Sequence, residues 1–173
     1  MLEVTVKGAI SERMNIILGG NRLKAGGELL RGLSPEIAIY RSAVYSQLDY
    51  RFDEGIKLVG GVQWNKPDNS SLDASTRLGY IHEWSENWTT KLLYGEAFRS
   101  PAGTEFFINA PAFRGNPDLK PETIQTFDAQ VIYQQSNYSL STTLYRSKQK
   151  DVISRVNLDD NSTQLVQLNL GEL

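Results

Sequence analysis

The feature that most constrains this chain is the alternation of apolar and polar residues along its extended stretches. Between residues 37 and 145, apolar side chains recur at every second position, while helix-period patterns are scarce. A period of two puts neighbouring side chains on opposite faces of a strand, so each stretch predicts a strand with one apolar and one polar face. The clearest apolar rows are Val44, Leu48, Tyr50 and Phe52; Ile56, Leu58, Val62 and Trp64; and Phe127, Ala129, Val131 and Tyr133. We therefore expect an all-β chain, an antiparallel up-and-down meander of about nine strands.

The connections between these strands differ in length in a regular way. Short polar turns are expected near residues 12, 54, 86 and 136, and long connections near residues 30, 69, 110 and 159. Transmembrane barrels show this asymmetry, with short turns on one rim and long loops on the other. A soluble antiparallel sheet can also present one polar face, so the pattern favours a membrane barrel and leaves a soluble β domain open.

Two of the long connections define expected strand ends. A strand is expected over Met14–Leu23, followed by a Gly-rich loop over residues 24–36 with room for a short helical turn around Glu28 to Leu33. A polar loop is expected over residues 156–162, between a strand that starts near Tyr138 and a final strand from Thr163.

Aromatic side chains and the polar face support the membrane interpretation. Trp and Tyr concentrate at bilayer interfaces, and aromatic residues bracket the short turns of this chain. The opposite face carries Arg, Asp, Lys and Gln near mid-strand, which a dry core does not tolerate unpaired but a water-filled or plugged lumen does. The predicted interface aromatics are Phe52, Trp64, Trp84, Trp88, Tyr133 and Tyr138.

Composition excludes several functions. The absence of cysteine removes disulfides, thiolate metal sites and cysteine nucleophiles, and a net charge of −2 without a basic stripe argues against a nucleic-acid partner. A lone histidine, His82, makes neither a catalytic triad nor a metal site. The acidic stretches Asp68–Asp73 and Asp159–Asn161 lack the ligand spacing of a calcium loop. We expect no catalytic residue, no metal and no cofactor, so the chain is not expected to be an enzyme.

The stretch from Leu92 to Glu122 contains the longest connection. Proline lacks an amide donor and pushes its predecessor toward extended geometry, so the four prolines here are expected to exclude regular structure. Connections of this length are more often functional than decorative. The four prolines are Pro101, Pro111, Pro117 and Pro121.

Two motifs in this stretch carry a resemblance to a known family. Y-G-E-A-F-R-S-P spans Tyr94–Pro101 and G-N-P-D-L-K-P-E spans Gly115–Glu122, followed by Tyr145 and the K-Q-K-D-V-I of Lys148–Ile153. This pattern resembles the TonB-dependent outer-membrane receptors, in which the first motif ends a rising strand and the second starts a descending one. The residues that the resemblance assigns to shaping the strand ends are Tyr94, Phe98, Arg99, Pro101, Asn116, Pro117, Leu119, Pro121 and Glu122.

The resemblance implies an architecture larger than this chain. Family members are barrels of about 22 strands with a plug in the lumen. Residues 1–173 show no plug, TonB box, signal peptide or further strands, so we expect an internal part of the barrel domain, a curved open sheet when taken alone. The implied location is the outer membrane of a Gram-negative bacterium. The implied partners are outer-membrane lipid and the TonB complex, the latter through the plug and TonB box.

The resemblance also implies a function. The receptors take up a scarce ligand, typically a ferric siderophore, haem or cobalamin, by an energised step in which no covalent bond changes. The predicted ligand contacts lie in the long loop, because aromatic rings stack on ligands and arginines pair with anions. They are Arg99, Phe106, Phe107, Phe113 and Arg114. Two alternatives stay open: a passive porin-like channel, and a soluble antiparallel β domain that acts as an adhesin or glycan binder. A single curved sheet would favour a barrel, whereas two sheets packed face to face would favour the soluble domain.

Overall fold

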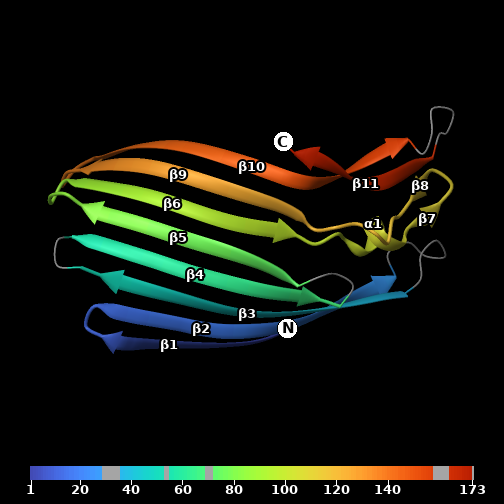
Figure 1. The fold of residues 1–173 in the computed structure, drawn as a ribbon, viewed down its shortest axis with the longest axis horizontal. Coiled ribbons are helices and arrows are strands. Elements are labelled where there is room, and N and C mark those ends of the chain that lie inside the picture. The colour runs from blue at the N-terminus through green and yellow to red at the C-terminus, as the bar shows by residue number, and fades with distance from the viewer. Residues whose placement is uncertain (29–35, 53–54, 69–71, 158–163, 173) are drawn as a thin grey trace.

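The computed structural model describes residues 1–28, 36–52, 55–68, 72–157 and 164–172. Nearly all of these residues belong to strands of one sheet, which Figure 1 shows from its broad side. The elements are β1 (Leu2–Ser11), β2 (Met14–Glu28), β3 (Glu36–Arg51), β4 (Ile56–Pro67), β5 (Asp73–Glu83), β6 (Trp88–Arg99), α1 (Gly103–Phe107), β7 (Asn109–Ala110), β8 (Phe113–Arg114), β9 (Glu122–Gln134), β10 (Ser139–Asn157) and β11 (Leu165–Glu172).

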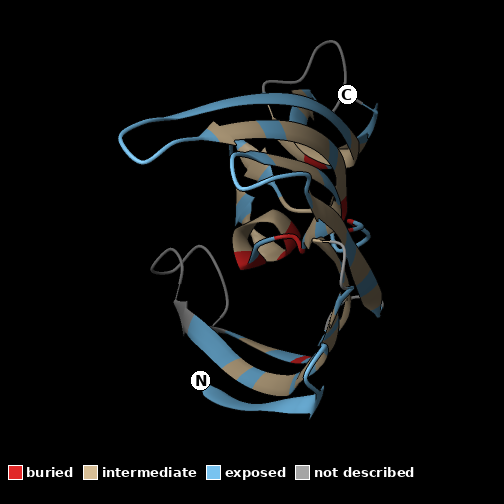
Figure 2. Cartoon of the chain, turned by 90° about the vertical axis from the view of Figure 1, so that its left-hand side faces the viewer, coloured by how far each residue is buried: buried red, intermediate tan, exposed pale blue. Residues whose placement is uncertain are grey.

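The strands follow one another as consecutive hairpins. The order in the sheet is β1-β2-β3-β4-β5-β6-β9-β10-β11-β8-β7, and all long strands pair antiparallel with their neighbours in sequence. The expected meander of about nine strands is confirmed. Two further strands of two residues each, β7 and β8, lie in the long connection, and β8 adds to β11 in parallel. Figure 2 shows that the sheet curves strongly around α1, and the described residues form one curved sheet and no second layer.

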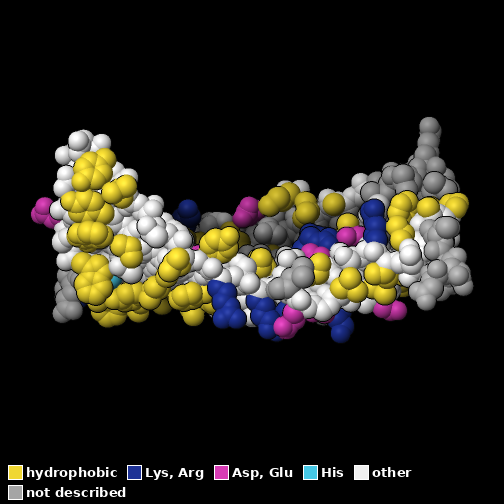
Figure 3. Space-filling view, turned by 90° about the horizontal axis from the view of Figure 1, so that it is seen from above, with side chains coloured by type: hydrophobic (Ala, Val, Ile, Leu, Met, Phe, Trp, Pro, Cys, Tyr) yellow, Lys and Arg dark blue, Asp and Glu magenta, His cyan; other side chains and the backbone are white. Residues whose placement is uncertain are grey.

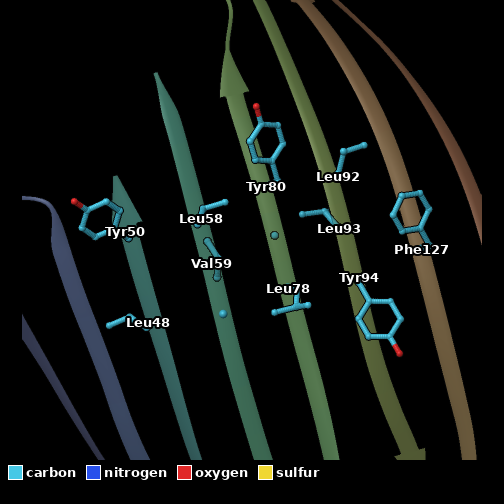
Figure 4. Close-up of a pocket in the computed structure, with 12 residues that line it drawn as sticks. Leu48, Tyr50, Leu58, Val59, Leu78, Tyr80, Leu92, Leu93, Tyr94 and Phe127 are labelled. Atoms are coloured by element: carbon cyan, nitrogen blue, oxygen red, sulfur yellow. The ribbon is translucent and has the colours of Figure 1, made fainter. Parts of the chain in front are cut away.

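Each strand presents opposite residues to the two sides of this curve. One cross-strand row runs Leu48, Gly60, Leu78, Tyr94 and Phe127, and it belongs to the convex face. This face leaves large apolar side chains open: Leu78 is 54% exposed and Phe127 is 49% exposed. A shallow apolar groove of about 520 Å³ on it is formed by side chains of neighbouring strands (Figure 4). The fold therefore carries its apolar surface outside the curve, as expected for a wall that faces lipid.

Polar side chains cover the concave face and bond to one another. Lys57 Nζ lies 2.9 Å from Asp49 Oδ2, and the Gln47 amide donates to the same carboxylate at 2.9 Å. The Tyr45 hydroxyl lies 2.6 Å from Thr5 Oγ1. The Tyr45 ring covers Gly19, where a Cβ atom would collide with it. These polar groups of the predicted lumen face thus pair with one another along the wall.

Aromatic rings gather at the end of the sheet that holds the short turns. Trp88 and Tyr133 have ring centroids 4.7 Å apart, and Tyr133 lies 6.0 Å from Tyr138. Phe52 packs against Tyr50 at 4.6 Å in the neighbouring hairpin. Figure 3 shows hydrophobic side chains clustered at this end of the molecule.

The two remaining predicted interface aromatics differ in position. Trp84 also lies at the short-turn end, stacked on His82 at 3.8 Å, and its indole N–H donates to Thr90 Oγ1 at 2.9 Å. Trp64 lies farther along β4, toward the long connections, opposite Val44 and 41% exposed on the convex face.

Two strands are longer than the sequence pattern predicts. β2 continues to Glu28 because its pairing with β3 extends through Ala25 opposite Ile39, past the expected end at Leu23. β10 continues to Asn157 because its last residues pair with β11. The helical turn expected around Glu28 to Leu33 falls on residues that lie outside the described part of the chain, apart from Glu28 itself, which is in β2.

The expectation that the four prolines exclude regular structure from the long connection was wrong. Between Pro101 and Pro111 the chain forms α1 and β7, so prolines do not exclude regular structure there. The five residues of α1 contain no proline, and Glu105 accepts a hydrogen bond from the Ala102 amide at 2.7 Å, which satisfies one of the unpaired donors at the start of the helix. Within the described ranges, no helix is long and apolar enough to cross a bilayer.

Gly55 supplies a test of the short-turn geometry. Its φ of +71° lies in the left-handed region, and a Cβ atom would lie 2.6 Å from the Glu83 carbonyl oxygen. Gly55→Ala should therefore lower the free energy of unfolding by about 2 kcal/mol, since left-handed geometry alone costs about 1–2 kcal/mol in a residue with a Cβ. Urea unfolding of the full-length protein in lipid vesicles measures the change.

Gly95→Ala is the matched control for Gly55→Ala. A Cβ atom at Gly95 has no other atom within 4 Å, so alanine there should change stability by less than about 0.5 kcal/mol. Equal effects of the two substitutions would contradict the strained turn at Gly55.

Candidate ligand-binding rim

The candidate site is the connection of residues 100–121 together with the concave wall beneath it. The connection joins β6 to β9 at the end of the sheet opposite the short turns (Figure 1). Figure 2 shows α1 inside the curve of the sheet and not on its convex side. The long connection therefore lies over the polar face, where a ligand in the lumen would meet it.

Arg99, the last residue of β6, ties the connection to the wall. Its Nε donates to Glu122 Oε2 at 2.6 Å, and its two terminal nitrogens donate to the Glu105 carboxylate at 2.9 and 3.3 Å. The backbone register sets up the first contact, because Arg99 and Glu122 are directly opposite each other in the β6–β9 pair. One guanidinium thus joins β6, β9 and α1.

Glu122 extends this network to a third strand. Its second carboxylate oxygen accepts a hydrogen bond from the Ile153 amide in β10 at 2.7 Å. The Arg99 guanidinium holds the pKa of Glu122 below its usual range, with the Ile153 amide acting in the same direction against the effect of burial. Glu122 and Glu105 together raise the pKa of Arg99. Both strand-end residues lie beyond the roughly ten residues that a tilted strand needs to cross the hydrocarbon.

The second half of the connection is held by two asparagines. Asn116 accepts from the Asp118 amide at 2.9 Å and donates to the Gln167 carbonyl of β11 at 3.1 Å. Asn169 accepts from the Lys120 amide at 2.8 Å and donates to the Lys120 carbonyl at 2.9 Å. The segment before β9 is thereby fastened to β11, about fifty residues later in the chain.

The predicted aromatic contacts differ in exposure. Phe106 is buried at 7% exposure and packs against Phe107, with ring centroids 5.6 Å apart. Phe113 is half-buried, and the Arg155 guanidinium lies 5.1 Å from the centre of its ring. Arg114 is exposed. Of the predicted contacts, Arg99 and Arg114 are exposed, Phe107 and Phe113 are half-buried and Phe106 is buried. Ligand contact by all five stays a prediction.

Of the residues assigned to strand-end shaping, Tyr94 lies on the convex face within β6, and the others lie at or near the rim. The Tyr94 hydroxyl donates to Glu96 at 2.7 Å, and Glu96 also accepts from Gln125 at 3.1 Å and from the Thr76 amide at 3.1 Å. Pro101 and Leu119 are buried, with Leu119 at 5% exposure. Pro121 is buried as well, Pro117 is exposed, and Phe98 lines the wall cleft described next.

A polar cleft of about 370 Å³ lies in the wall beside the connection. Arg41, Arg77 and Arg99 line it from three strands, together with Asn65. Within the described ranges Arg41 and Arg77 have no ion-pair partner, and the buried Nδ2 of Asn65 has no hydrogen-bond acceptor. Glu96 also lines the cleft, but its carboxylate already accepts three hydrogen bonds. Donors without a carboxylate partner thus share this cavity, so the cleft suits a group rich in acceptor oxygens, such as a carboxylate or catecholate.

Sequence reasoning misses part of this site. Glu105 and Asn169 hold the connection but were not among the predicted residues; an acidic residue three positions after Ala102 is a helix-start signal that identifies Glu105. The cleft arginines Arg41 and Arg77 carry no motif, and only the pairing of strands brings them to one cavity.

The described part of the chain contains no cluster of potential metal-ligating side chains. No group of three or more His, Cys, Asp or Glu side chains there is arranged to hold a metal ion. His82 packs between Tyr80 and Trp84. Of the two acidic stretches considered for calcium, residues 69–71 and 159–161 lie outside the described residues.

These features define a class of protein: a curved antiparallel wall, apolar outside and polar inside, with long connections over one rim. A family model described as "TonB dependent receptor-like, beta-barrel" matches residues 17–172. The chain belongs to this family, as part of its β-barrel. A search of curated proteins found no match.

Solved structures show the same fold. The siderophore receptor PirA from Pseudomonas aeruginosa superposes with a TM-score of 0.80 at 17% identity, over 98% of this chain and 33% of that one. A mutant of the ferric enterobactin receptor PfeA from the same organism, in complex with enterobactin, gives 0.77 at 17% identity, over 98% and 31%. The FrpB iron transporter from Neisseria meningitidis gives 0.74 at 14% identity, over 97% and 30%. This chain spans about a third of the length of these proteins.

Removal of the Arg99 guanidinium tests whether the network orders the connection. Arg99→Gln leaves the buried Glu122 carboxylate and Glu105 without their ion pair. Since Arg99 is partly exposed, we expect a loss of about 1–2 kcal/mol in the local stability of the connection. Hydrogen exchange of the amides of residues 105–116 in the full receptor should then be roughly tenfold faster.

Arg114→Gln is the control on the same connection. Arg114 is exposed and its side chain has no ion pair among the described residues, so this substitution removes the same charge without releasing a carboxylate. If exchange in Arg99→Gln matched that in Arg114→Gln, the network would not be what holds the connection.

Proposed function

We propose that this chain is part of the wall of an outer-membrane receptor that takes up a scarce metal chelate in a TonB-coupled step. A ferric siderophore is the leading ligand class, with haem and cobalamin chelates as related cargoes. The location is the outer membrane of a Gram-negative bacterium, where the convex face contacts lipid. The TonB complex acts through a plug and TonB box outside this sequence.

The observation that carries the proposal is the rim itself. A long connection held inside the curve by Arg99 lies beside a cleft in which Arg41 and Arg77 have no ion-pair partner among the described residues. An anionic chelate offers several acceptor oxygens to such donors, and aromatic surface at Phe107 and Phe113 suits its flat rings. Siderophore and iron receptors among the structures of similar fold support this ligand class.

Uptake of this kind needs no catalytic group. Arg99 pairs with Glu105 and Glu122, and Arg41 and Arg77 line the cleft, which fits recognition and release of an intact ligand. We therefore propose a transport function without an enzymatic step.

The rim and the convex face distinguish the proposed receptor from a passive channel and from a soluble glycan-binding domain. A passive channel needs an open lumen and does not need a connection fastened across several strands. A soluble glycan-binding domain needs a second layer or a polar outer face, whereas exposed Leu78, Leu144 and Phe127 cover the convex face here. The energised receptor accounts for both features.

Uptake of radiolabelled iron tests the proposal. Cells that carry the full receptor as their only route for a given chelate are grown under iron limitation and supplied with ⁵⁵Fe-loaded siderophores, one at a time. We expect uptake of at least one chelate, and its loss when the TonB complex is deleted or the proton gradient is collapsed. Uptake that persists without energy would indicate a passive channel, and binding of glycans by a detergent-free soluble product would indicate the third alternative.

A further inference from the structure

On the convex face of β2, the outward row changes from apolar to basic. From the short turn, this row reads Met14, Ile16 and Leu18, and after Gly20 it continues as Arg22 and Lys24. The register of β2 with β3 is continuous over this length, so all these side chains point to the same side.

The same change occurs on two other strands. The outward row of β4 is apolar up to Trp64 and then reaches Lys66. The outward row of β10 is apolar up to Leu144 and continues with Arg146 and Lys148. In Figure 3, Lys and Arg side chains lie away from the hydrophobic short-turn end. Arg22 and Lys66 share one row of the sheet, since both lie opposite Ser42, whereas Arg146 lies opposite Phe127. Cations thus follow an apolar row on three strands, and we call these cations the basic band.

The position of the basic band along the strands can be compared with the thickness of the hydrocarbon core. A tilted barrel strand crosses the hydrocarbon in about 9–11 residues. Counted from the short turns, eight residues of β2 (14–21), ten of β4 (56–65) and seven of β10 (139–145) precede the first cation of the outward row. The cations lie at the end that carries the long connections, which faces outward in such barrels. They are therefore placed at the headgroups of the outer leaflet.

Tyr40 holds two of these cations together. The Arg22 guanidinium lies 5.9 Å and the Lys24 ammonium 5.5 Å from the centre of the Tyr40 ring. Both cations are exposed, and neither forms an ion pair with a described residue. On β10, by contrast, Lys148 pairs with Glu172 at 2.6 Å. The cluster of Arg22, Lys24 and Tyr40 thus offers the least neutralised positive charge on this face.

We propose that Arg22, Lys24 and Tyr40 bind the phosphate group of an outer-leaflet lipid whose acyl chains lie along the apolar rows below. Guanidinium and ammonium donors match phosphate oxygens, and long aliphatic stems let such cations reach the level of lipid headgroups. The ring of Tyr40 keeps the two donors side by side, and its amphipathic shape suits the interface. The inference rests on the proposed function only for the orientation of the wall in an outer membrane.

Native mass spectrometry of the full receptor in detergent tests the site. The probes are dipalmitoyl phosphatidic acid and dipalmitoylglycerol, which share acyl chains and differ in the phosphate. We expect the double substitution Arg22→Gln with Lys24→Gln to weaken binding of the phosphatidic acid by about tenfold and to leave dipalmitoylglycerol unchanged. Tyr40→Leu, which keeps both charges, should give a smaller loss. Inorganic phosphate should not displace the lipid at equal concentration.

The matched control carries the same charge change on the other face. Arg51 and Lys91 point to the concave side, so Arg51→Gln with Lys91→Gln should alter phosphatidic acid binding by less than twofold. Equal losses in the two double variants, or no loss in either, would overturn the site. Iron uptake measured in the same variants separates this outcome from a failure of the proposed function, since the lipid site predicts uptake unchanged.

Discussion

The ladder of backbone hydrogen bonds is the constraint on which the rest of this structure depends. A bilayer offers no water to unpaired amides, so a spanning sheet must satisfy every backbone group through its neighbours. The long hairpins pair each strand with its neighbours from β1 to β11, and their registers fix which side chains face outward. A shift of one residue in any strand would move its apolar row into the lumen.

At the rim, where the strands end, side-chain contacts take over from the backbone hydrogen bonds. Arg99 and Glu122 are the last opposed pair of β6 and β9, and their ion pair continues the sequence of contacts beyond the final backbone bonds. Glu105 and Ile153 then connect that pair to α1 and to β10. The connection therefore derives its order from side chains that the sheet has already positioned. A surface built in this way is anchored to the wall that surrounds it.

The fold could be predicted from the sequence because the alternation of apolar and polar residues is a local signal. Alternation in β3, β4 and β9 predicts both the strands and their faces, and the motifs around Arg99 and Glu122 indicate the family. The true lengths of β2 and β10 were not predictable from their own residues, because Gly26 and Asn157 are in strands only through pairing with a partner. The cleft was also missed, since Arg41 and Arg77 are brought together by three strands of known register and by no sequence motif.

The central claim is that one face of this sheet contacts lipid and the other faces a polar lumen. The sequence contains no cysteine, so single cysteines can be introduced along β6 at Leu92, Leu93, Tyr94 and Gly95 in a receptor without other cysteines. Spin labels at these sites report collisions with oxygen, which dissolves in lipid, and with a water-soluble nickel complex. In membranes, positions 92 and 94 should favour oxygen and positions 93 and 95 the nickel complex. Equal accessibility to the nickel complex at all four positions would contradict a membrane-spanning wall.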